Sequence, residues 1–188
     1  VLFADLIKFK IIPEIHSPVI LGRGAVEQYL DNPIHDVLHS KIIDASKKLS
    51  RNHELVIYEG TGHPGVGSVT NLSNAQVAKM LNAEVIMIVE GGIGSTIDML
   101  NMCLSLFREQ NVNLLGVIIN KVIPDKKDKV EKYVGSWLKE NNIPLLGLIP
   151  YDATLAFPII RTINEAIRGT ITHFEEHSSN RISGILAG

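Results

Sequence analysis

Four short apolar runs without polar alternation divide the chain, and each is bordered by polar or glycine-rich residues. Runs of this kind are typical of strands buried on both faces, as in a parallel sheet covered by helices. Segments of helix length separate the runs, so the sequence predicts repeated β-α units with right-handed crossovers. We therefore expect an α/β fold, a parallel β-sheet flanked by helices. The four predicted neighbouring parallel strands are Leu55–Tyr58, Val85–Val89, Leu114–Ile119 and Leu145–Ile149.

The segments between these runs carry apolar residues at helical spacing. We expect Asn74 to cap one of the helices and Gly169 to stop the last one. The predicted helices cover 24–31, 34–49, 74–81, 95–110, 125–141 and 159–167, and residues 1–10 also have helical spacing.

Residues 170–180 break this pattern and are predicted to form a linker. The chain begins in mid-pattern and ends in what resembles the opening of another strand. We therefore expect one domain over 1–169, incomplete at its amino end, with 170–188 forming a linker and the start of a following domain.

Composition narrows the class of protein. The 188 residues suit one domain, and a net charge of −2 without a long basic block gives no support for general attraction to nucleic acid or membranes. No apolar run approaches the ~20 residues that span a bilayer and no signal peptide is visible, so we expect a cytoplasmic protein. Cys103 is the single cysteine, which excludes an internal disulfide, and its surroundings predict a packed thiol in a helix.

Glu59 directly follows the first apolar run and opens a loop with four glycines within 60–67. Open parallel sheets bind ligands just past the carboxyl ends of their strands. A carboxylate beside an amide-rich loop suits Mg²⁺ carried by phosphate groups. The alternative is a strand that happens to end in an acid before a flexible loop.

Two other predicted strands end in residues suited to a nucleotide base. Asn120 ends the third run and has both a donor and an acceptor for a purine edge, although asparagine is also common turn chemistry. Pro150 and Tyr151 follow the fourth run and are placed to wall the same pocket.

Gly92 and Gly94 open a predicted helix in part of a dinucleotide-binding pattern. The third position of that pattern is Ile97 rather than glycine, so a tight strand-to-helix turn explains the two glycines better than a Rossmann site. We expect Glu59, Gly92 and Asn120 to line one cleft.

Two histidine groups have spacings that suggest metal ligands. His35 and His39 lie four apart without a third ligand in view, and a solvated helix face explains them better. His173 and His177 with Glu176 are likewise better explained as a polar surface loop.

The order of these motifs resembles the dethiobiotin synthetase-like P-loop proteins. The most similar branch includes cobyrinic acid a,c-diamide synthase-like proteins and the amino-terminal domain of long bacterial phosphate acetyltransferases. The resemblance covers about 17–188 and implies an ATP site. It implies Glu59 as catalytic residue and Mg²⁺ ligand, Asn120 as adenine contact, and Gly60 and Thr61 as part of the substrate and phosphate loop. The matching stretches are 59–68, Asn71, 74–78 and 91–98.

One family feature is absent from these 188 residues. The family opens with a strand and a Gly-x-x-x-x-Gly-Lys-Ser/Thr loop that holds the phosphates, and no such stretch occurs here. We interpret this as a missing first strand and P-loop rather than a loss of nucleotide chemistry.

The resemblance implies ATP-dependent activation of a small-molecule carboxylate followed by C–N bond formation, in a homo-oligomer. The rival hypothesis is a non-catalytic sensor or scaffold. A partitioning ATPase of the ParA/MinD type is disfavoured because its acidic pattern is missing from the Glu59 strand and no amphipathic membrane tail is present.

Overall fold

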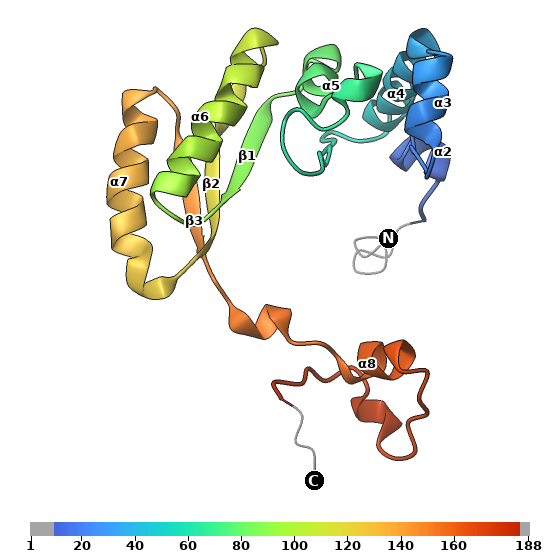
Figure 1. Ribbon diagram of the computed structural model, residues 1–188, viewed down its shortest axis with the longest axis vertical. Helices are drawn as coiled ribbons and strands as arrows, with labels where there is room; N and C mark the ends of the chain where they lie inside the picture. The colour runs from blue at the N-terminus through green and yellow to red at the C-terminus, as the bar shows by residue number, and fades with distance from the viewer. Residues whose placement is uncertain (1–9, 185–188) are drawn as a thin grey trace.

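The computed structural model describes residues 10–184 and contains a parallel β-sheet beside two helices (Figure 1). The helix predicted over 1–10 lies outside the described residues, apart from its last one. Within them the sheet has three strands in the order β1-β2-β3, every pair parallel. Three of the four predicted strands and the α/β class are therefore confirmed. The strands are β1 (Val85–Glu90), β2 (Leu114–Val122) and β3 (Leu145–Pro150).

Helices α6 (Gly94–Glu109) and α7 (Lys127–Glu140) lie side by side over one face of this sheet (Figure 1). Their apolar stripes meet the strand residues that point to this face, and the resulting core is closed to solvent. A one-turn 3-10 helix, η2 (Pro124–Lys126), leads into α7. The core includes Leu100, Val117, Ile119, Val134 and Leu138, each fully buried.

Cys103 packs within this core, as predicted. Burial raises the pKa of its thiol, and the Sγ donates to Sδ of Met99 at 3.7 Å. A buried thiol with a raised pKa holds little thiolate at neutral pH, which argues against a nucleophile.

Each helix that leads into a strand ends in an asparagine with left-handed backbone geometry. Asn82, Asn111 and Asn142 have φ values of 50°, 52° and 56°. After α7, the N–H of Asn142 donates to Lys139 O and that of Ile143 to Leu138 O. This paired pattern is the Schellman motif, which satisfies the last helical carbonyls and turns the chain into the next strand.

The amino-terminal helices form a second, smaller cluster of buried residues. Tyr29, Leu38 and Leu72 are its buried members. Pro13 begins helix α2, because proline suits the first helical position. The helices are α2 (Pro13–His16), α3 (Ala25–Asp31) and α4 (His35–Ser50).

The predicted strand Leu55–Tyr58 is wrong for the described residues. Its residues belong to no strand, and Leu55 and Ile57 are 75% and 85% exposed. An apolar run indicates burial, but a strand also needs a neighbour for its backbone hydrogen bonds. Within residues 10–184 no strand pairs with this run, and β1 forms the edge of the sheet. The hydroxyl of Tyr58 bonds instead to that of Ser46 in α4, at 2.7 Å.

Helix α5 (Asn74–Met80) follows the glycine loop, which contains the 3-10 helix η1 (Ser68–Thr70). Its cap is Ser73 rather than the predicted Asn74. The Ser73 hydroxyl accepts the N–H of Gln76, and the Gln76 side chain accepts the N–H of Ser73. This capping box leaves the Asn74 side chain available for other contacts.

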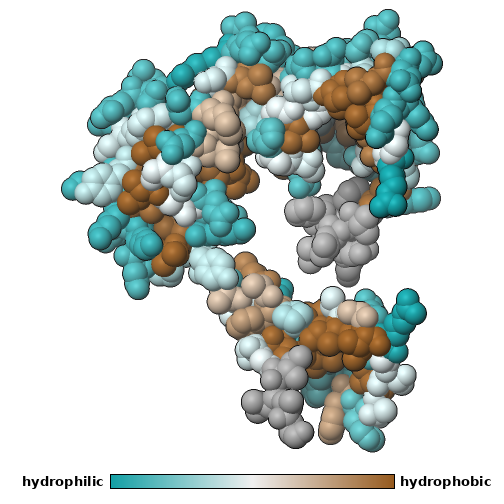
Figure 2. Space-filling view, viewed as in Figure 1, coloured by the Kyte–Doolittle hydropathy of each residue, from teal (hydrophilic) through white to brown (hydrophobic). Residues whose placement is uncertain are grey.

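The last part of the described chain folds around Arg181. Its guanidinium donates to the carbonyl oxygens of Thr154, Leu155 and Phe157, and Ile159 bridges to Arg181. Figure 2 shows apolar surface over this region, near α8. The elements are the 3-10 helix η3 (Ala153–Ala156), α8 (Ile160–Ala166) and the 3-10 helix η4 (Glu175–His177).

The end of α8 corrects the predicted stop at Gly169. Arg168 takes the left-handed position with φ 52°, and Gly169 is the next residue, whose N–H donates to Asn164 O at 2.9 Å.

Candidate functional site

The carboxyl ends of β1 and β2 lie directly beside each other. Glu90 is paired with Asn120 in the ladder, and the N–H of Gly91 donates to the carbonyl oxygen of Asn120 at 2.7 Å. The glycine turn that leads into α6 therefore starts at the strand end that carries Asn120.

The end of β3 continues the same edge. Pro150 is paired with Val122, and the N–H of Tyr151 donates to Val122 O at 2.8 Å. The side chains of Pro150 and Tyr151 are exposed. The predicted base-contacting residues Asn120, Pro150 and Tyr151 thus come from adjoining strands at one edge of the sheet.

The Asn120 side chain already makes one contact within its own turn. Its Oδ1 accepts the N–H of Lys121 at 2.8 Å, and Lys121 has a φ of 56°. The amide oxygen therefore serves the turn, as in many strand ends closed by asparagine. The two N–H groups on Nδ2 are the part of this side chain suited to a ligand.

Gly92 lies in a tight turn that leaves no room for a side chain. A Cβ at this position would be 2.7 Å from Ser95 Oγ and 3.1 Å from Thr96 Oγ1. Thr96 in turn donates its hydroxyl to Glu90 O at 2.8 Å. Packing of the turn explains the glycine, which supports the turn interpretation over the dinucleotide pattern.

Glu59 stands in the loop after the segment that did not form a strand. Its side chain is exposed. The prediction placed Glu59 at the sheet edge because a strand was expected to end there, and the ladder of the sheet does not extend to it. A shared cleft of Glu59 with Gly92 and Asn120 therefore stays a prediction.

The far end of the Glu59 loop is attached to the amino-terminal helices. The hydroxyl of Tyr29 donates to Thr70 O at 3.2 Å and bonds to the ring of His35. His39 Nε2 lies 3.3 Å from Asn71 O. His35 thus contacts Tyr29 and His39 contacts the loop, and both side chains are half-buried. Sequence reasoning missed Tyr29, because an aromatic residue in a predicted helix is usually interpreted as part of the hydrophobic core.

The near end of the loop is attached to α5 through Asn74, which donates to the carbonyl oxygens of Thr61 and His63. Sequence reasoning treated Asn74 as a helix cap. The available signal was the Ser-x-x-Gln pattern at Ser73 and Gln76, which assigns the cap to Ser73 and leaves Asn74 for another role.

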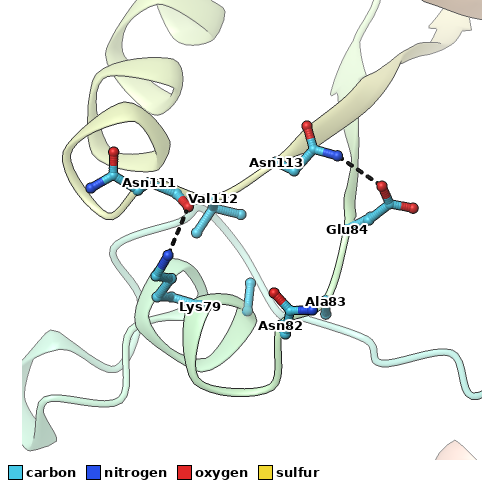
Figure 3. A pocket seen from close by; sticks show the side chains of 8 residues that line it. Lys79, Asn82, Ala83, Glu84, Asn111, Val112 and Asn113 are labelled. Atoms are coloured by element: carbon cyan, nitrogen blue, oxygen red, sulfur yellow. Dashed lines mark hydrogen bonds between the residues drawn. The ribbon is translucent and has the colours of Figure 1, made fainter.

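The larger of the two pockets described for this part of the chain lies at the opposite, amino edge of the sheet. It has a volume of about 400 Å³, and Figure 3 shows Lys79 bonded to Asn111 O and Asn113 bonded to Glu84 across it. A second pocket, of about 90 Å³, lies beside Pro150 at the carboxyl edge. Neither includes Glu59 among its lining residues.

Residues 10–184 contain neither a metal-binding cluster nor a membrane-spanning helix. No group of three or more histidine, cysteine or acidic residues there is placed to hold a metal. His177 and Glu176 form an exposed contact of 3.9 Å, in line with a polar surface loop. None of the helices described is long and apolar enough to cross a membrane.

Comparison with known proteins identifies relatives over most of the chain. The family model described as "AAA domain" matches residues 9–158. A cobyric acid synthase of Trichodesmium erythraeum is 31% identical over 139 residues, which are 72% of this chain and 28% of that protein. A phosphate acetyltransferase of Pseudomonas putida is 27% identical over 183 residues, which are 92% of this chain and 26% of that protein. The chain thus spans about a quarter of these relatives, and no solved structure matches it.

Proposed function

The chain belongs to the AAA domain family, in the dethiobiotin synthetase-like group of P-loop proteins, and we propose that it is a domain that binds ATP with Mg²⁺. The observation that carries the proposal is the alignment of three strand ends. Gly91, Asn120 and Tyr151 follow one another along the carboxyl edge through backbone hydrogen bonds and ladder pairs. Ligands of open parallel sheets bind at this edge.

In this proposal the base lies against the ends of β2 and β3. Asn120 donates from Nδ2 to a ring nitrogen of adenine, while its oxygen stays with the Lys121 turn. Pro150 and Tyr151 provide an apolar wall for the face of the base. Such contacts select the base but supply little affinity, about 1–3 kcal/mol for a hydrogen bond in a charged or buried setting.

The phosphates lie toward the glycine turns in this arrangement. Gly60 and Thr61 supply backbone groups next to Glu59, and Gly92 supplies them at the start of α6. The family's phosphate-binding loop would have to come from outside these 188 residues, because the sequence holds no Gly-x-x-x-x-Gly-Lys-Ser/Thr stretch.

A single exposed carboxylate at Glu59 fits Mg²⁺ better than a metal held by protein alone. Mg²⁺ keeps several waters and is commonly bound through one or two carboxylates together with substrate phosphates. The lack of a three-residue metal cluster in the described part of the chain agrees with a cation that arrives with the nucleotide. The bound cation would neutralise charge on the transferred phosphoryl group.

The reaction we propose is ATP-dependent carboxylate activation followed by C–N bond formation. A carboxylate oxygen attacks the γ-phosphorus, which releases ADP and gives an acyl phosphate. An amine then attacks the acyl carbon, and inorganic phosphate leaves. Relatives named cobyric acid synthase support a small-molecule carboxylate as substrate. A cytoplasmic location and a homo-oligomeric state complete the proposal.

A second candidate is a regulatory domain without catalysis. It is favoured by the phosphate acetyltransferase match, which extends over 92% of the chain, against 72% for the cobyric acid synthase match. Both candidates bind ATP at the same site, but only the enzyme converts it to ADP.

Measuring ATP binding with and without Mg²⁺ tests the shared part of the proposal. Wild-type protein is expected to bind ATP more tightly with Mg²⁺ than without it, and Glu59→Gln is expected to lose that difference. An unchanged metal dependence in Glu59→Gln would contradict the role of Glu59. ADP formation that requires a carboxylate and an amine would then select the enzyme over the regulatory domain.

A further inference from the structure

The loop after Glu59 folds back onto the start of α5. The N–H of Asn74 donates to Val66 O and that of Ala75 to Pro64 O, both at 3.1 Å. The first N–H groups of a helix have no partner inside it. Here the loop carbonyls of Val66 and Pro64 accept those N–H groups, so the amino-terminal end of α5 holds the loop by hydrogen bonds.

The side chain of Asn74 adds a second attachment closer to Glu59. Its Nδ2 donates to Thr61 O at 2.9 Å and to His63 O at 3.0 Å. One amide nitrogen thus uses both of its hydrogens on two carbonyls of the same loop. We call these two hydrogen bonds, from Asn74 Nδ2 to Thr61 O and His63 O, the bracket. They fix the direction of the chain two residues after Glu59.

Gly60 fits against the other side of the same amide group. A Cβ on Gly60 would lie 2.9 Å from Asn74 Cγ and 3.0 Å from Asn74 Oδ1. Real Cβ atoms essentially never come within 3.0 Å of another heavy atom, so a side chain at residue 60 would have to displace the Asn74 amide. Gly60 and Asn74 are therefore a matched pair, one leaving the space that the other fills.

We propose that Asn74 is the positioning residue of the Glu59 loop. By holding the carbonyls of Thr61 and His63 it restricts the backbone at Gly60, and so keeps the carboxylate of Glu59 in one place for Mg²⁺. The metal part of this inference rests on the function proposed for Glu59. The bracket itself rests only on the contacts given above.

The bracket is tested by amide hydrogen exchange on the 188-residue chain. Asn74→Asp keeps the shape of the side chain but replaces its two donors by an acceptor facing two carbonyl oxygens. Faster exchange is expected in this variant at Val66, because its N–H donates to His63 O, one of the two carbonyls that Asn74 holds. Gln76→Ala is the matched control, because it removes the side-chain half of the capping box at the same end of α5 and leaves the bracket intact. Unchanged exchange in Asn74→Asp, or equal acceleration in Gln76→Ala, would overturn the proposal.

Paramagnetic broadening tests whether the bracket serves the metal. Mn²⁺ with ATP is titrated into the chain, and broadening of the Gly60 and Thr61 amide signals is followed. Wild type is expected to show broadening that Asn74→Asp reduces several-fold. If Glu59→Gln removes the broadening and Asn74→Asp leaves it intact, the positioning role is wrong. If Glu59→Gln leaves it intact, the proposed function fails, and the exchange result alone decides on the bracket.

A double-mutant comparison gives an independent check on the contact between Gly60 and Asn74. Gly60→Ala is expected to lower the urea midpoint of the wild-type chain, because the new methyl group meets the Asn74 amide. In the Asn74→Ala background the same change is expected to shift the midpoint far less. Equal shifts in the two backgrounds would show that Gly60 and Asn74 are not coupled, which would overturn the proposal.

Discussion

Gly91 donates its backbone N–H to the carbonyl oxygen of Asn120 at 2.7 Å, and this bond joins the ends of two neighbouring strands. It places the turn into α6 beside the strand end whose side chain we assign to the base. Main-chain hydrogen bonds join the strands of this edge, so a side chain at residue 120 that keeps the contact to Lys121 can be introduced without breaking it. That property allows the role of Asn120 to be tested separately from the fold.

Asn120→Asp tests the proposed ligand contact of the Asn120 side chain separately from its contact with the Lys121 turn. The carboxylate still accepts the N–H of Lys121, whereas the Nδ2 donors are lost. We expect a stability close to that of wild type and ATP binding weakened by roughly 5- to 150-fold, the equivalent of about 1–3 kcal/mol. Asn120→Ala should weaken binding similarly and also lower stability. Titration with ATP alongside urea denaturation distinguishes the two, and wild-type affinity in Asn120→Asp would remove Asn120 from the site.

Asn142→Ala tests the left-handed turn between α7 and β3. Alanine has no side-chain group to offset the cost of a positive φ, which is about 1 kcal/mol at such a position. Asn142→Gly carries no such cost and is expected to be near neutral. Free energies of unfolding from urea titrations compare the two variants. An alanine variant as stable as the glycine variant would contradict the backbone geometry.

Asp152 supplies a prediction about pH. The hydroxyl and then the N–H of Thr154 bond to its carboxylate and hold its pKa below the ordinary value of 3.8, with a smaller effect from Arg181. Because the folded-state pKa is depressed, the stabilisation is present above the ordinary pKa and is lost as pH falls through the folded value.

Thr154→Val removes the hydroxyl that contributes most to this shift. The pKa of Asp152 is expected to rise, and Thr154→Ser, which keeps the hydroxyl, should leave it low. A carboxyl ¹³C titration by NMR measures both variants. The same pKa in the valine and serine variants would assign the shift to the backbone N–H and Arg181 instead.

The sequence allowed the α/β class to be predicted because parallel strands form uninterrupted apolar runs. The expected burial on both faces is wrong, since alternate strand residues such as Ile86 and Ile88 are exposed. Three uninterrupted apolar runs became β1, β2 and β3, and the helical spacing between them became α6 and α7. Leu55–Tyr58 has the same pattern and did not form a strand. An apolar composition indicates that a segment prefers burial. Whether it forms a strand also depends on having a neighbouring strand with which its backbone can pair.

The candidate site was predictable only where it follows directly from strand ends. Asn120 lies near the end of β2, Pro150 ends β3 and Tyr151 follows it, and their placement at one edge follows from parallel topology. The Glu59 loop is different, because its course depends on two other contacts. Tyr29 is distant from it in sequence, and Asn74 was predicted to be a helix cap. Local patterns do not reveal such contacts.

Chemical-shift mapping of Mg²⁺·ATP on the 188-residue chain tests the central claim most directly. Base contacts alone supply too little free energy for tight binding, since about 4 kcal/mol corresponds to 1 mM. The account therefore predicts a dissociation constant in the millimolar range or weaker, with shifts concentrated at Gly60, Gly92, Asn120 and Tyr151. Low-micromolar binding, or shifts confined to the amino-edge pocket around Lys79, would contradict it.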